Sequence, residues 1–168
     1  AKGLTAYEYQ CGRGVRIGSE TAGLIGQEAQ KHGIQLSLHA PYFINLSTDE
    51  TEKKQKNIGY VLESCRAARD MGADRIVVHT GGVGKKRTRD AAMANSRVNV
   101  REILAAKDDA GYTDITICLE TMGKIDVIGT AQEIMELVAL DDRLLPCIDF
   151  GHLNARTHGD TRRSCRAV

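Results

Sequence analysis

Four short apolar runs in this sequence each stop at a residue whose side chain commonly binds metal ions. The four end residues, about one supersecondary unit apart, are His39, His79, Glu120 and Asp149. Alternating Leu36 and Leu38 predict a buried strand before His39, and Pro41 ends it because proline has no backbone N–H to donate. In parallel β/α folds, side chains at the carboxyl ends of neighbouring strands converge on one site. Any one of these residues alone is more often a cap or a solvated loop residue, but four in succession predict a shared site.

Helical patterns separate these strands. Residues 5–10 predict a further strand, and helices are expected at 19–31, 49–72, 88–111 and 130–140. Asp49, with Glu52 three residues later, is expected to cap the second helix. Crossovers of this length return each strand parallel to the one before, which leaves two α/β folds, an open doubly wound sheet or a TIM-type barrel. A complete barrel takes ~250 residues. If the barrel alternative holds, these 168 residues form a partial barrel of about five strands and four helices.

Composition limits the class of protein. With 42% hydrophobic residues and no linker, residues 1–168 are expected to form one domain or part of one. The five cysteines are odd in number and widely spaced, which favours free buried thiols and a reducing, cytoplasmic compartment. No apolar run approaches the ~20 residues of a membrane helix, and no signal peptide precedes the first strand, so no membrane partner is expected. The net charge of +1 excludes the overall basic field of a non-specific nucleic-acid binder.

The residue types at the strand ends predict a metal site. Imidazole nitrogens and carboxylate oxygens are supplied by His39, His79, Glu120, Asp149 and His152. This mixture suits Zn²⁺ or Mn²⁺ better than Mg²⁺. Glu120, between two imidazoles and Asp149 in the expected order of strands, could bridge two ions, and such paired ions support phosphoryl chemistry.

Loops after the strands carry positive charge and one exposed aromatic candidate. The basic residues are Arg13, Arg16, Lys85, Lys86, Arg87, Arg89 and Arg156. Placed beside the metal site, they are candidates for phosphate contacts, although the lysine pair is equally typical of a solvated loop. Tyr42, just past Pro41, is a candidate to stack on a base or a sugar, against the alternative of ordinary loop packing. Asn45 is expected to anchor its own turn.

These same residues carry a resemblance to a known family. The segments His-Ala-Pro-Tyr-Phe-Ile-Asn-Leu (39–46), Val-His-Thr-Gly (78–81), Cys-Leu-Glu-Thr (118–121) and Cys-Ile-Asp-Phe-Gly-His (147–152) resemble the successive metal-binding motifs of endonuclease IV. That family of apurinic/apyrimidinic endonucleases belongs to the xylose isomerase-like TIM barrels. The resemblance covers about residues 6–158 and implies the barrel alternative. It also implies a zinc enzyme of base-excision repair that cleaves double-stranded DNA 5′ to abasic sites, with no covalent enzyme intermediate.

The resemblance also assigns roles to individual residues. It implies that His39, His79 and Glu120 hold one zinc ion and that Glu120, as the catalytic carboxylate, bridges to a second ion bound by Asp149. His152 would belong to a third. Two or three Zn²⁺ ions are implied, with Mn²⁺ as a substitute. Tyr42 matches the tyrosine that enters the DNA, and Arg13 lies near the loop that presents an arginine to the duplex.

The sequence also departs from the family pattern. The family's first barrel strand and its later ligands have no counterpart here, and residues 160–168 resemble nothing in the family, so we expect a truncated barrel with an atypical tail. Unpaired barrel edges would favour homo-oligomers. Two alternatives stay open: a sugar or sugar-phosphate isomerase or epimerase of the same barrel group, and a catalytically incomplete fragment.

Overall fold

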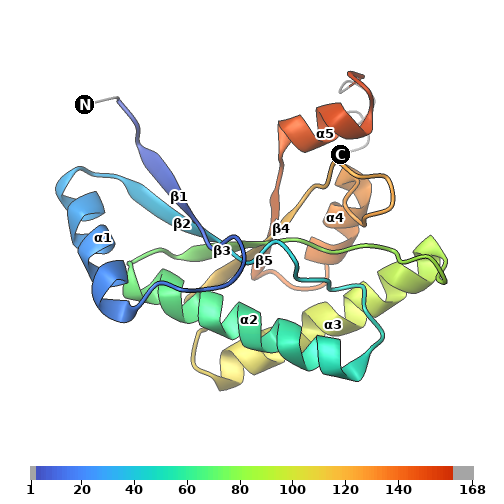
Figure 1. Cartoon of the computed structure of the whole chain (residues 1–168), viewed down its shortest axis with the longest axis horizontal. Helices are drawn as coiled ribbons and strands as arrows, with labels where there is room; N and C mark the ends of the chain where they lie inside the picture. Colours follow the sequence, from blue (N-terminus) through green and yellow to red (C-terminus); the bar gives the residue numbers. More distant parts are fainter. Residues whose placement is uncertain (1–2, 161–168) are drawn as a thin grey trace.

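The computed structural model describes residues 3–160, which form one parallel sheet with helices between its strands (Figure 1). The strands are β1 (Ala6–Gln10), β2 (Gln35–His39), β3 (Arg75–Val78), β4 (Thr116–Glu120) and β5 (Leu144–Cys147). The helices are α1 (Ser19–Lys31), α2 (Thr51–Asp70), α3 (Arg89–Asp109), α4 (Ala131–Val138) and α5 (Phe150–Arg156). In Figure 1, α1, α2 and α3 lie along one side of the sheet.

The order of the strands decides between the two α/β folds. The sheet runs β1-β2-β3-β4-β5, and all four pairings are parallel. A doubly wound sheet reverses its strand order at a switch point, whereas a TIM-type barrel adds each new strand beside the last. The fold is therefore a five-stranded part of a parallel (β/α) barrel, as expected.

The two faces of the sheet have different neighbours. One paired row crosses the sheet through Leu38, Ile76, Ile117 and Leu144, and all four side chains belong to the main hydrophobic core under the helices. Because side chains alternate along a strand, the next row, from Gln10 to His39 and on to Val77, faces the opposite way. That second face carries the strand-end residues of the candidate site.

Two local predictions are wrong. Glu50, not Asp49, is the N-cap of α2, and it makes no side-chain cap bond; the Asp49 carboxylate instead lies 3.5 Å from a guanidinium nitrogen of Arg87. The expected four helices miss α5, which is only seven residues long and contains Gly151, so it has no periodic apolar stripe. Asp149 is its N-cap and accepts a hydrogen bond from the backbone N–H of His152 at 2.7 Å.

Several other expectations concern the edges and the composition. Within the described part of the chain, β1 and β5 each pair on one side only. The expected tail at 160–168 lies outside the described residues apart from Asp160. The four cysteines of the described residues are free thiols, and burial raises the pKa of Cys65 to about 12. None of the helices in residues 3–160 combines the length and apolar character needed to cross a membrane.

Candidate metal centre

Three neighbouring strands bring the first group of ligands together. His39 is the last residue of β2, His79 follows β3 directly, and Glu120 ends β4. Their side chains meet at the carboxyl edge of the sheet: Nε2 of His79 lies 2.8 Å and Nε2 of His39 lies 3.2 Å from the same carboxylate oxygen of Glu120. The two imidazole rings meet edge to face with their centroids 4.9 Å apart. The predicted convergence of these three residues is present in the fold.

Backbone carbonyls fix the tautomer of both histidines. Nδ1 of His39 is 2.8 Å from the carbonyl oxygen of Ala40, and Nδ1 of His79 is 3.1 Å from that of Tyr42. A carbonyl oxygen can only accept, so each Nδ1 carries a proton; in a neutral ring Nε2 then directs a lone pair at Glu120, whereas in a protonated ring it donates to that carboxylate. Histidines that bind metals are held in this way by a second partner. Either protons or a cation must lie among these converging lone pairs, so the donor set fits a divalent metal ion.

Charge and burial shift the pKa of the Glu120 carboxyl in opposite directions. The side chain is 6% exposed, and burial alone raises the pKa of its carboxyl, but hydrogen bonds and charge from His39 and His79 outweigh this and lower the pKa to about 2. For His39, burial lowers the pKa and the hydrogen bond to Glu120 raises it, with a net increase. Glu120 is therefore an anionic carboxylate in a partly dry site.

A second group shares Glu120 with the first. Ligand atoms of Glu120, Asp149 and His152 lie within 4.8 Å of one another, as do those of His39, His79 and Glu120. Nδ1 of His152 lies 3.4 Å from Glu120 and 3.7 Å from Asp149, and it donates a hydrogen bond of 2.9 Å to the carbonyl of Thr121. The lone pair of this ring is therefore on Nε2. All five predicted ligands thus lie in two adjoining groups.

A cavity of about 320 Å³ opens beside the ligands and is also lined by Glu8 and Gln10 of β1. The Glu8 carboxylate accepts hydrogen bonds from the Ser37 hydroxyl at 3.0 Å and from Gln10 at 3.1 Å. The sequence predicted a strand here without a role for these side chains. Side chains alternate along a strand, so Tyr7 and Tyr9 lie on one face of β1 and Glu8 lies on the other. This alternation is the sequence signal that could have placed Glu8 on the same face as His39.

Tyr42 lies at the rim of this cavity, and Arg13 directly follows Gly12, which also lines it. Tyr42 is 55% exposed and lines the cavity, and its backbone N–H donates to the carbonyl of Gly12 at 3.2 Å. Arg13, the next residue after Gly12, is exposed. The two predicted DNA-contacting residues are therefore on adjoining loops next to the metal ligands.

Three of the predicted phosphate-binding arginines are instead bonded within the protein. Arg87 donates to the carbonyl of Ser47, and Arg89 forms an ion pair with Glu133. Arg156 donates to several backbone carbonyls of the loop between β4 and α4. Lys85 and Lys86 remain exposed, so they are better placed for phosphate than these arginines are.

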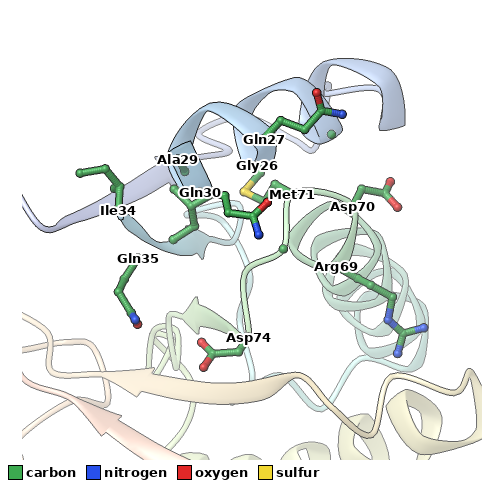
Figure 2. A pocket seen from close by; sticks show the side chains of 13 residues that line it. Gly26, Gln27, Ala29, Gln30, Ile34, Gln35, Arg69, Asp70, Met71 and Asp74 are labelled. Carbon is green, nitrogen blue, oxygen red and sulfur yellow. The ribbon is translucent and has the colours of Figure 1, made fainter. Parts of the chain in front are cut away.

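A larger cavity of about 670 Å³ lies at the opposite end of the strands, between α1 and the end of α2 (Figure 2). Its charged side chains are paired with neighbours: Arg69 with Asp114, Asp70 with Arg66 at 2.6 Å, and Asp74 with Arg75 at 2.7 Å. None of the predicted ligands lines it. We therefore place the functional site in the smaller cavity.

The fold and the ligands together define a class of protein, the parallel (β/α) barrels with a histidine and carboxylate metal site at the carboxyl ends of their strands. Within this class, the chain belongs to the family described as xylose isomerase-like TIM barrel, which matches residues 1–167.

Curated relatives support the resemblance to endonuclease IV. An uncharacterized protein of Methanocaldococcus jannaschii is 30% identical over 156 residues, which are 93% of this chain and 55% of that protein. A protein of Acholeplasma laidlawii named probable endonuclease 4 is 30% identical over 134 residues, 74% of this chain and 44% of the relative. The chain thus spans about half the length of these relatives.

Solved structures share the fold with different named activities. A D-tagatose 3-epimerase-like protein aligns with a TM-score of 0.79 and 20% identity, over 97% of this chain and 62% of that one. Endonuclease IV from Thermus thermophilus aligns with a TM-score of 0.66 and 20% identity, over 96% of this chain and 64% of that one. At such identities these likenesses establish the fold alone.

Proposed function

We propose that this site belongs to a metal-dependent phosphodiesterase of the endonuclease IV type, which cleaves DNA 5′ to abasic sites in base-excision repair. The observation that carries the proposal is the convergence of His39, His79 and Glu120 beside the exposed ring of Tyr42. Relatives named probable endonuclease 4 support it.

The ligand groups give each residue a part in this function. His39, His79 and Glu120 would hold one Zn²⁺ or Mn²⁺ ion, and Glu120 would share its carboxylate with a second group that includes Asp149 and His152. A bound ion would supply Lewis-acid stabilisation of the charge that develops on the phosphate. The resemblance assigns His152 to a third ion, whereas the geometry groups it with Glu120 and Asp149.

The cavity rim would make the DNA contacts. Tyr42 presents an exposed ring that can stack on an unpaired base or sugar, and Arg13 on the adjoining loop can contact the backbone. Lys85 and Lys86 would add phosphate contacts. An abasic site suits this arrangement because the missing base leaves room for an aromatic side chain.

Incision of a labelled duplex with one abasic-site analogue, with Zn²⁺ or Mn²⁺ added, tests the proposal. We expect a single cut 5′ to the analogue, lost on chelation and reduced at least about 100-fold by His79→Ala. His32→Ala is the matched control, since His32 also pairs with a carboxylate, that of Glu28, but lies on the surface. Incision that survives both chelation and His79→Ala would contradict the proposal.

A sugar isomerase or epimerase is the second candidate, favoured by Glu8. This carboxylate lines the cavity without belonging to either ligand group, so it is free to act as a base beside a carbonyl. Solvent deuterium incorporated next to the carbonyl of a ketose, and lost in Glu8→Gln, would support this function. An incomplete fragment would bind one metal ion or none, so elemental analysis that finds near zero ions per chain would favour it over both enzymes.

Location and assembly are part of the same proposal. Free thiols at Cys11, Cys65, Cys118 and Cys147 support a reducing, cytoplasmic compartment.

Self-association through the edges of β1 and β5 stays a prediction, which sedimentation at several concentrations would test.

A further inference from the structure

Helix α5 lies beside the loop of residues 121–130, between β4 and α4 (Figure 1). Two side chains of α5 bind this loop. His152 donates to the carbonyl of Thr121 at 2.9 Å. Arg156, four residues later, donates to the carbonyls of Lys124 at 2.7 Å, Met122 at 3.0 Å, Val127 at 3.2 Å and Ile125 at 3.4 Å. Residues four apart share one helix face, so one face of α5 binds both the start and the middle of the loop.

The environment of Arg156 is unusual for a cation. Its hydrogen bonds in the described residues all go to backbone carbonyls, and two of these carbonyls are shared with Arg89. Burial, and then the charge of Arg89, lowers the pKa of Arg156. Desolvating a cation next to another cation costs free energy. What Arg156 contributes is geometric: its planar guanidinium can fix the positions of several acceptors, which a lysine ammonium would hold less rigidly.

The position of this loop sets the position of His152. The imidazole is bonded to Thr121 on one side, and on another side the loop approaches it at Gly123. A Cβ atom at Gly123 would lie 3.3 Å from Cδ2 of the His152 ring and 3.3 Å from its carbonyl oxygen. A shift of the loop would therefore move the ring relative to Glu120.

We propose that Arg156 is a positioning residue of the second ligand group, which fixes the imidazole of His152 beside Glu120 and Asp149 by binding the 121–130 loop. The inference rests on the proposed metal-dependent function. The first group does not depend on Arg156, because His39 and His79 donate to carbonyls of a different loop, after β2.

Zinc titration of the wild type and of Arg156→Gln, in competition with a chelator, tests this directly. We expect two classes of site in the wild type, with the second weakened about 10- to 100-fold in the variant and the first unchanged. Arg156→Lys keeps the charge and should recover part of the loss. Arg69→Gln is the matched control: its guanidinium also binds a loop carbonyl, that of Gly111, but at the far end of the sheet. An unchanged second class, or equal weakening of both classes, would overturn the proposal.

Imidazole NMR of the metal-free protein gives a second readout, with Arg156→Lys as the variant if Arg156→Gln fails to fold. We expect the Nδ1–H proton of His152 to exchange faster with water in the variant, while those of His39 and His79 keep their wild-type rates. An unchanged His152 signal overturns the inference. A wild-type chain that binds no zinc contradicts the proposed function instead, and the NMR comparison still decides whether Arg156 positions His152.

Discussion

The two ligand groups share Glu120 but are built differently. In the first group the side chains of His39 and His79 are 12% and 16% exposed and extend from strands paired on both sides. In the second, the side chains of His152 and Asp149 are 36% and 39% exposed and follow β5, which pairs on one side only in the described residues. The first ligand set is thus held at less exposed strand ends, whereas the second is supported by hydrogen bonds from side chains of α5.

The loop after β2 shows why the first group is rigid. Its carbonyls hold both histidines, and its own turn is anchored by Asn45, as predicted, which accepts from the backbone N–H of Ser47 at 3.0 Å. Asn57 of α2 donates to the carbonyl of Asn45 at 2.7 Å, and Asn99 of α3 donates to the following carbonyl at 2.6 Å. Amides from two helices therefore fix the end of the same loop whose beginning holds the imidazoles.

Glu120→Gln should produce the largest effect, because it removes the charge common to both groups. We expect the affinity of both classes of zinc site to fall by at least about 100-fold, measured by competition with a chelator. Glu8→Gln is the matched control, since Glu8 lines the same cavity but belongs to neither group. Equal losses in the two variants would show that cavity charge, rather than direct ligation, governs binding.

Single histidine variants would separate the groups. His79→Ala should weaken the first class by on the order of 100-fold, because the substitution removes a ligand whose ring is held in place by a backbone carbonyl. His152→Ala should weaken only the other class, since His152 makes no contact with His39 or His79 in the described structure. Titrations in which His152→Ala weakens the first class would contradict the distinction between the two groups.

The support of the 121–130 loop should make stability depend on pH. Burial alone raises the pKa of the Glu133 carboxyl, but Arg89 and the backbone N–H groups of Gly129 and Thr130 lower it to about 2. A lowered native pKa stabilises the fold above the ordinary value of about 4.5, by on the order of 3 kcal/mol here. Glu133→Gln should lose this contribution at pH 7.

Urea unfolding of both proteins from pH 7 to pH 3 checks the sign. The difference in free energy of unfolding should shrink as pH falls below about 4.5, and more than half of it should be gone at pH 3. Glu136→Gln is the control, because Glu136 pairs with Arg97 on an exposed face of the same helix. A difference that grows on acidification would contradict the prediction.

Sequence alone named the ligands of both groups, but not the helix that supports the second. Apolar runs that end in His39, His79, Glu120 and Asp149 are local signals, and parallel pairing converts them into neighbours. Helix α5 and the role of Arg156 left no such signal, because a seven-residue helix has no stripe and the partners of Arg156 are carbonyls. Backbone acceptors are the same for every residue type, so their contacts depend on the tertiary fold.

Tyr42→Ala should separate metal binding from DNA binding. The contact of this residue with the first group is its backbone carbonyl, which the substitution keeps, so zinc affinity should not change. Affinity for an abasic duplex should fall about 10-fold, from the loss of one stacking contact. Tyr7→Ala is the matched control, with a ring 52% exposed on the other face of the sheet. Equal losses in fluorescence-polarisation titrations would remove Tyr42 from the proposed interface.

Gly123→Ala should have the smallest effect and act on the second group alone. The added Cβ, 3.3 Å from the His152 ring, needs a shift of a few tenths of an ångström, whereas the first group lies on other loops. We expect about threefold weaker binding of the second zinc class, an effect smaller than the loss of a supporting hydrogen bond. Gly59→Ala in α2 is the control, because no atom lies within 4 Å of its added Cβ, and alanine there should stabilise the helix by up to about 1 kcal/mol. If Gly123→Ala leaves both classes unchanged, the loop tolerates displacement at this point, and the fixed position of His152 then depends on Thr121 and Arg156 alone.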